Sequence, residues 1–137
     1  MSCTNVYRIP KGPLPGKKII IHGTPKCNAN TFSVNIVLGA NVDCDVIAFH
    51  LVVRFNSCSV VCNSRTACGW GKEEVFQCNP FCKGVPFTME ISIDQCGYKI
   101  SVNCKYLCSF NKRIETGDCN NFLIFKADVS VSNVQFC

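Results

Sequence analysis

The stretch DVIAFHLVVRF, residues 45–55, alternates between two kinds of side chain. Its odd positions, from Ile47 to Phe55, are all apolar, and its even positions include His50, Val52 and Arg54. A β-strand directs alternate side chains to opposite faces. The stretch therefore predicts a strand with one face in a hydrophobic core and a second face that is available for binding.

Similar period-2 runs occur along the rest of the chain, separated by Gly, Pro, Asn and Ser turns. They are NTFSVNIVLG (30–39), PFTMEISID (86–94), GYKISVNCKYLCSF (97–110) and NFLIFKADVSVS (121–132). No stretch predicts a helix of ten or more residues. The 137 residues fit a single domain, 1–137, with an N-terminal arm at 1–15 that is laid along it. Many short strands with one polar face each favour an all-β sandwich of two sheets over a barrel.

Thirteen cysteines are unusual for a chain of this length, and their number is odd. Three pairs, such as Cys104 and Cys108, have C-x3-C spacing, which does not match a zinc knuckle, so we expect no metal and no cofactor. Within residues 97–110 the even positions from Ile100 to Phe110 form the apolar set, so Cys104 and Cys108 are expected in the core. Reduced thiols are the favoured interpretation, and several native disulfides remain the alternative.

Composition excludes several classes of protein. The net charge of +5 comes from scattered Lys and Arg residues with no basic run, which argues against nucleic-acid binding. No apolar stretch approaches the length of a membrane span, so we expect no membrane insertion. The N-terminal MSCTNVYRIPKGPLPG has no apolar signal core, and the chain has no Asn-x-Ser/Thr sequon. We therefore expect synthesis in the cytosol.

A set of functional side chains lies within 24 positions: His50, Arg54, Asn63, Trp70 and Glu73. An imidazole, a guanidinium, an amide and a carboxylate are donors and acceptors that can form hydrogen bonds with sugar hydroxyls. Trp70 is the only tryptophan, and its flat indole suits the apolar C–H face of galactose. Each residue alone has an ordinary explanation as a surface or core side chain, but the ordered set predicts a carbohydrate site.

This ordered set resembles the carbohydrate-recognition motif of the galectin family. In that motif a His and an Arg four residues later lie on one strand, followed by an Asn on the next strand and then a Trp and a Glu. The surrounding RFNS, VVCNS, WGKEE and PFCKG, and the flanking GTPKCNANTFSVNIVLG and ISIDQCGYKISVN, are similar to the family as well. The resemblance covers almost the whole chain.

The resemblance implies a jelly-roll β-sandwich of two antiparallel sheets that binds galactose-containing glycans without catalysis or metal. It implies that His50, Arg54 and Asn63 hydrogen-bond galactose, that Trp70 stacks on the ring, and that Glu73 reaches the next sugar and orients Arg54. It also implies a homodimer that cross-links glycans, and a protein present in the cytoplasm and outside the cell after secretion without a leader.

Two positions depart from the family pattern. Val52 stands where galectins carry an Asn two residues after the His, and Val75 stands where they carry an Arg two residues after the Glu. We expect weakened or altered specificity for galactosides. The alternative is a structural or interaction protein that has lost sugar binding. An enzyme, such as a Cys–His hydrolase, is disfavoured because no spacing ties a histidine to a particular cysteine.

Overall fold

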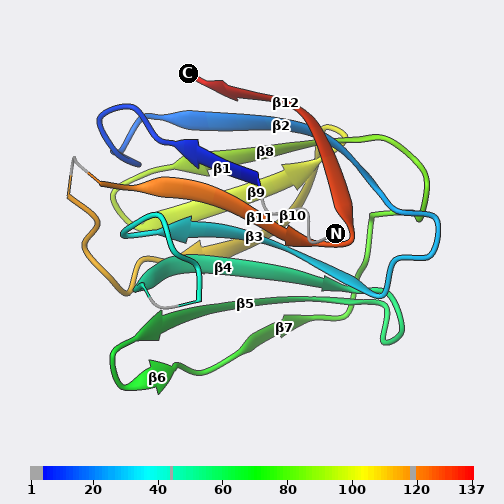
Figure 1. Ribbon diagram of the computed structural model, residues 1–137, viewed down its shortest axis with the longest axis horizontal. Coiled ribbons are helices and arrows are strands. Elements are labelled where there is room, and N and C mark those ends of the chain that lie inside the picture. The colour runs from blue at the N-terminus through cyan, green and yellow to red at the C-terminus, as the bar shows by residue number, and fades with distance from the viewer. Residues whose placement is uncertain (1–4, 44, 118–119) are drawn as a thin grey trace.

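The computed structural model describes residues 5–43, 45–117 and 120–137, which form two antiparallel sheets packed face to face (Figure 1). These residues contain twelve strands and no helix. The seven-stranded sheet has the order β1 (Asn5–Arg8), β11 (Phe122–Ala127), β3 (Thr31–Val37), β4 (Ile47–Arg54), β5 (Ser59–Thr66) and β6 (Gly69–Trp70), with β7 (Glu74–Phe76) also paired to β5. The five-stranded sheet has the order β10 (Lys105–Asn111), β9 (Gly97–Val102), β8 (Phe87–Ile93), β2 (Lys18–Pro25) and β12 (Val129–Phe136). The predicted two-sheet sandwich is confirmed.

The core lies between the inner faces of the two sheets. From β4, the side chains of Phe49, Leu51 and Val53 are fully buried there. From β8 on the other sheet, Met89 and Ile91 are buried against them in the same cluster. Both sets are the apolar positions of the predicted alternating runs, and their removal from water is the main source of stability for such a sandwich.

The alternation of inward-facing and outward-facing side chains in β4 is interrupted near the start of the strand. A register irregularity separates the pairs Ile47↔Arg65 and His50↔Asn63, so β4 is bulged before His50. As a result Ala48 lies in the main core, whereas Ile47 joins a small cluster with Val37 on the other side of the sheet. The prediction that Ile47 shares a face with Phe49 was wrong, because a bulge reverses the side on which the preceding residue lies.

The prediction for Cys104 was also wrong. The run 97–110 divides into β9 and β10 at a tight turn in which Asn103 and Cys104 have φ values of 51° and 68°. Two left-handed residues in a row are typical of a two-residue hairpin turn, and they leave Cys104 exposed. A bulge between Tyr106 and Cys108 then restores the pattern, because Cys108 is 1% exposed and Tyr106 is 67% exposed.

The run 121–132 also becomes two strands, because the chain passes from one sheet to the other at Asp128. Ala127 has a left-handed φ of 73°, and β11 and β12 belong to different sheets. The carboxylate of Asp128 accepts hydrogen bonds from the backbone N–H groups of Asn30, at 2.8 Å, and Thr31, at 3.3 Å. These bonds hold the crossing point against the start of β3.

The cysteines in the described part of the chain form no disulfide bonds. Cys62 and Cys108 are buried in the core, one from each sheet, and the other eight described cysteines are exposed. Cys3, Cys44 and Cys119 lie outside the described residues. Within the ranges given above, no group of three or more His, Cys, Asp or Glu side chains could hold a metal ion, and no helix could cross a membrane.

Candidate functional site

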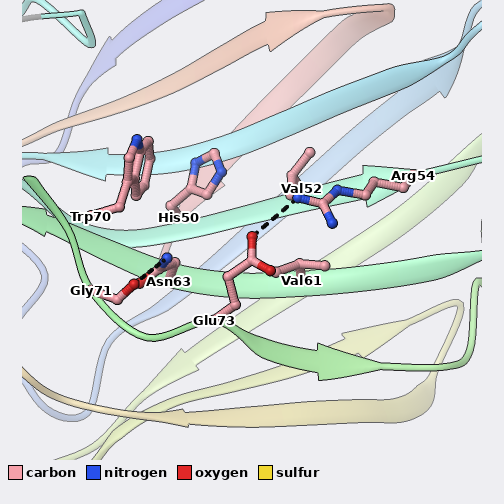
Figure 2. A pocket seen from close by; sticks show the side chains of 8 residues that line it. All are labelled: His50, Val52, Arg54, Val61, Asn63, Trp70, Gly71 and Glu73. Carbon is pink, nitrogen blue, oxygen red and sulfur yellow. Dashed lines mark hydrogen bonds and ion pairs between the residues drawn. The ribbon is translucent and has the colours of Figure 1, made fainter. Parts of the chain in front are cut away.

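The five predicted side chains line one groove on the outer face of the seven-stranded sheet (Figure 2). His50 and Arg54 come from β4, Asn63 from β5, Trp70 from β6, and Glu73 from the segment before β7. Val52, Val61 and Gly71 complete the lining, and the groove has a volume of about 350 Å³. The structure therefore brings together every residue of the predicted set.

The pairing of β4 with β5 places the first residues of the set side by side. His50 lies directly opposite Asn63, and Val52 lies opposite Val61. Directly opposed residues of an antiparallel pair point to the same face with neighbouring Cβ atoms. Since Leu51 and Val53 are buried on the inner face, the alternate residues of β4 must face the groove.

Trp70 forms an exposed wall of the groove. The hairpin from β5 to β6 pairs Trp70 with Arg65, and the indole is 50% exposed. Its ring centroid lies 4.6 Å from that of His50, and the guanidinium carbon of Arg65 lies 5.3 Å from the indole centroid. Arg65 is itself held by hydrogen bonds to the carbonyl groups of Val42 and Asp45. The indole thus has fixed neighbours and keeps a free surface for a ligand.

The imidazole of His50 is held in one tautomer by a residue that the sequence did not single out. The Nδ1 atom of His50 lies 2.6 Å from Oδ1 of Asn35 on β3. The amide nitrogen of Asn35 donates to Ser33 Oγ at 3.0 Å and to the carbonyl of Ile124 at 3.1 Å, so its oxygen is the acceptor. Nδ1 of His50 therefore donates to Asn35, and the neutral ring has its lone pair on Nε2.

The surroundings also keep His50 neutral. Burial lowers the pKa of His50 from 6.5 to about 4, and the positive charges of Arg65 and Arg54 act in the same direction, while Glu73 opposes them. At neutral pH, Nε2 is consequently a hydrogen-bond acceptor. A neighbouring guanidinium from Arg54 supplies donors to the same groove.

Arg54 and Glu73 form an ion pair across the groove, with Nη2 of Arg54 3.2 Å from Oε2 of Glu73. Both side chains are partly exposed, at 42% and 49%, so the pair adds little to stability. Its effect is to orient the guanidinium, which can then donate its remaining N–H groups to a ligand. This geometry agrees with the predicted orienting role of Glu73.

Arg113 is a second supporting residue that the sequence did not reveal. It follows β10 of the opposite sheet, yet its Nη1 atom donates to Asn63 Oδ1 at 3.0 Å and to Ser64 Oγ at 3.1 Å. Its Nη2 atom donates to the carbonyl of Lys72 at 2.7 Å and to the carboxylate of Glu74 at 2.9 Å. Arg113 thus ties together both sides of the loop that carries Trp70 and Glu73.

These bonds also decide which way the Asn63 amide points. Its oxygen accepts from Arg113 and from the backbone N–H of Ser64 at 2.7 Å, and its nitrogen donates to the carbonyl of Gly71 at 3.0 Å. Only the second N–H of the amide remains for a ligand. No spacing pattern points to Arg113, because it lies 50 positions from Asn63 in the chain.

The two departures from the family pattern lie in one apolar row. Val52 on β4, Val61 on β5 and Val75 on β7 are successive register partners across three strands. Val52 and Val61 line the groove, whereas Val75 does not and is 48% exposed beside it. The floor of the groove is therefore apolar along this row and polar along the neighbouring row of His50 and Asn63.

The arrangement can bind a small polar ligand that has one apolar face. It offers an acceptor at His50 Nε2, donors at Arg54 and Asn63, a carboxylate at Glu73 and an exposed indole. None of the eight lining residues is a cysteine, so no thiol nucleophile accompanies the imidazole. The groove combines fixed polar groups with an exposed apolar surface, which is the chemistry of ligand recognition.

Residues 4–136 match the galactoside-binding lectin family. The chain is 31% identical over 132 residues to galectin-3 of Cricetulus longicaudatus, covering 93% of this chain and 52% of that protein. It is 35% identical over 120 residues to a 32 kDa beta-galactoside-binding lectin of Caenorhabditis elegans, covering 88% and 41%. The chain spans about half the length or less of these two relatives.

Solved structures of similar proteins have the same fold. A variant of human galectin-16 superposes with a TM-score of 0.82 at 29% identity, covering 98% of this chain and 94% of that one. A galectin of Caenorhabditis elegans also has a TM-score of 0.82, covering 97% and 89%. Its identity is 22%, so this second likeness bears on the fold alone.

The first prediction concerns the protonation of His50. Its ring should titrate near pH 4 instead of 6.5, measured by the pH dependence of its imidazole NMR signals. Because the folded protein resists this protonation, its free energy of unfolding should fall as the pH drops from 6.5 towards 4. Arg65→Gln removes one of the opposing charges and should move the midpoint upward. A midpoint near 6.5 in the unsubstituted protein would contradict the assignment.

The second prediction concerns Arg113. Arg113→Lys keeps the positive charge but loses the two guanidinium nitrogens that bond Asn63 and Glu74. It should lower the free energy of unfolding by about 1–2 kcal/mol. The side-chain amide signals of Asn63 should shift in the NMR spectrum, because its oxygen loses a donor. Lys112→Arg is the matched control, since it exchanges the same two residue types at the neighbouring position. Unchanged Asn63 signals in Arg113→Lys would rule out the positioning role.

Proposed function

Because the chain belongs to the galectins, the family of galactoside-binding lectins, we propose that its groove binds β-galactosides. Galectins are non-catalytic, so the protein is not an enzyme. The observation that carries the proposal is the convergence of His50, Arg54, Asn63, Trp70 and Glu73 on one groove. The exposed indole beside a set of fixed donors and acceptors is the arrangement that a pyranose ring requires.

Each side chain has a role in this proposal. Nε2 of His50 accepts a hydrogen bond from the axial 4-hydroxyl of galactose, and Arg54 donates to the same oxygen. Asn63 donates its remaining amide N–H to a neighbouring hydroxyl, and Trp70 stacks on the C–H face of the ring. Glu73 accepts from the second sugar while it holds Arg54 in place.

Specificity in this proposal is altered by the apolar row. Val52 cannot supply the amide that its family position carries, and Val75 cannot supply a guanidinium beside the second sugar. Losing such polar contacts weakens binding by about 1–3 kcal/mol each. The same valines favour a glycan that presents an apolar group to this row, such as a methyl or acetamido substituent.

The second candidate is an interaction protein that has lost sugar binding. Val75 is exposed and pairs with Val61, which pairs in turn with Val52, so the row could take an apolar side chain of a protein partner. The groove still holds its full set of polar residues around an exposed tryptophan, which favours the lectin.

We also propose that the lectin cross-links glycans as a homodimer. β1 and β12 are edge strands, one in each sheet, and have no second partner strand among the described residues. Edge strands of this kind can join the sheets of two protomers across a two-fold axis. Two grooves in one dimer would gain avidity for clustered glycans.

The proposed location is the cytoplasm and, after secretion that uses no leader, the cell exterior. The unpaired thiols of the described cysteines support synthesis outside the oxidising secretory route. Glycans on the cell surface would then be the partners, with no nucleic acid involved.

The third prediction tests sugar binding directly. The reduced protein should be retained on lactose-agarose and released by free lactose. Trp70→Ala should abolish retention, because it removes the stacking surface and weakens binding at least tenfold. Val85→Ala is the control, since it removes an exposed apolar side chain that lies outside the groove. Equal retention of Trp70→Ala and the unsubstituted protein would contradict the proposed site.

The fourth prediction tests the role of the apolar row. Val52→Asn should increase the affinity for lactose about tenfold, measured by calorimetry, because it restores one polar contact at the floor of the groove. Val52→Ala keeps the position apolar and should leave the affinity within about threefold of the starting value. If both variants bind alike, the missing amide is not what limits lactose binding.

The fifth prediction concerns assembly. Light scattering at concentrations of tens of micromolar should give twice the mass of 15.1 kDa. A charged substitution in the exposed edge, Val6→Glu in β1, should shift the protein to the monomer, because it places two carboxylates near the two-fold axis. A monomeric mass for the unsubstituted protein would exclude the dimer.

A further inference from the structure

The five-stranded sheet also has a hollowed outer face. One hollow of about 520 Å³ lies over β2, β8 and β12 and is lined by side chains that include His22, Thr88 and Asn133. A second hollow of about 280 Å³ is lined by Thr88, Glu90, Ser101 and a thiol. Thr88 borders both, so the two hollows adjoin and form one extended depression that runs across the sheet.

A bulge in the edge strand shapes one end of this depression. The register of β12 against β2 shifts between Val131 and Asn133, which inserts Ser132 as an extra residue. Ser132 and Asn133 are both exposed, and Ser132 Oγ donates to the backbone carbonyl of His22 at 3.1 Å. Bulges turn side chains out of the regular alternation. Here the bulge brings two consecutive polar side chains to the hollow.

An exposed aromatic side chain lies at the other end. Tyr106 is the register partner of Ser101, so it adjoins the second hollow on β10. It is 67% exposed, and its hydroxyl is 2.7 Å from Ser109 Oγ, which fixes the direction of the ring along the strand. A bulge after Tyr106 keeps this ring out of the core.

The depression repeats the chemistry of the first groove with different residues. His22 lies 3.2 Å from the hydroxyl of Thr88, as His50 is tied to a polar neighbour. Glu90 lies 3.6 Å from the Lys18 ammonium group, as Glu73 is paired with Arg54. An amide is present at Asn133 and an exposed ring at Tyr106.

We propose that the outer face of the five-stranded sheet is a second saccharide-binding site, which takes a neutral oligosaccharide. Imidazole, hydroxyl, amide and carboxylate groups form hydrogen bonds with sugar hydroxyls, and Tyr106 supplies the flat surface for a pyranose ring. Glu90 is balanced by Lys18, so the depression offers no unpaired charge for an ionic ligand. Asn133 on β12 and Tyr106 on β10 lie on the two edge strands of a five-stranded sheet, which are roughly 19 Å apart at the usual strand spacing, and this span suits an extended oligosaccharide.

The two sites lie on opposite sides of the molecule. The first groove is on the seven-stranded sheet and the second depression is on the five-stranded sheet, with the hydrophobic core between them. One chain could then hold two glycans at once and cross-link them without a dimer. This inference does not depend on the ligand of the first groove.

The test uses NMR of the ¹⁵N-labelled Trp70→Ala protein, in which the first groove is disabled. Maltotetraose, mannotetraose and lacto-N-neotetraose are titrated separately to about 10 mM, the range expected for a shallow site. At least one should produce saturable shifts in the backbone amides of Thr88, Ser101 and Tyr106. Arg54→Ala, which removes a partly exposed donor of the first groove, is a second disabled protein for the case in which Trp70→Ala does not fold.

Two variants and a matched control complete the design. Tyr106→Ala and Glu90→Gln should each weaken the outer-sheet binding about fivefold, the effect of losing one net contact. Ser92→Ala, on the outer face of β8 but outside both hollows, should leave it unchanged. The proposal is overturned if no probe gives saturable shifts on this sheet, or if Tyr106→Ala binds as strongly as Ser92→Ala. Retention of the unsubstituted protein on lactose-agarose reports separately on the first groove.

Discussion

The pairing of β4 with β5 is the constraint on which the rest of the site depends. Phe49, Leu51 and Val53 are buried between the sheets, and this burial fixes which residues of β4 face outward. A slip of one residue would exchange the two faces and place His50 in the core, at a cost of several kcal/mol for its unpaired polar atoms. The hydrophobic core therefore positions the polar groove, although the two share no side chain.

The groove is also held from behind by contacts that its own strands do not provide. Asn35 on β3 sets the tautomer of His50, and Arg113 from the opposite sheet sets the orientation of Asn63. Both supports bond the outward-facing residues without entering the groove. Polar side chains that are fixed in advance lose less conformational freedom when a ligand binds, which raises affinity at a given number of contacts.

The outer faces of the two sheets present their side chains to solvent in different ways. On the seven-stranded sheet, β4 alternates regularly from His50 to Arg54, after its bulge, and presents a polar row beside an apolar row of Val52, Val61 and Val75. On the five-stranded sheet, two bulges bring additional side chains to the surface, at Ser132 and at Tyr106. The two bulges thus bring polar and aromatic side chains to the outer face of the five-stranded sheet, beyond those that regular alternation places there.

Local sequence determined the class of fold and the identity of the five groove residues, because period-2 alternation and short spacings are properties of neighbouring positions. It could not reveal the bulge at Ile47, the left-handed turn at Cys104, or the supporting roles of Asn35 and Arg113. Those features depend on which strands pair and in which register. Asn35 reaches His50 across 15 positions and Arg113 reaches Asn63 across 50, and only the packed sandwich brings them within hydrogen-bonding distance. The tertiary structure decided them, because burial of the core selects the register and the register selects the partners.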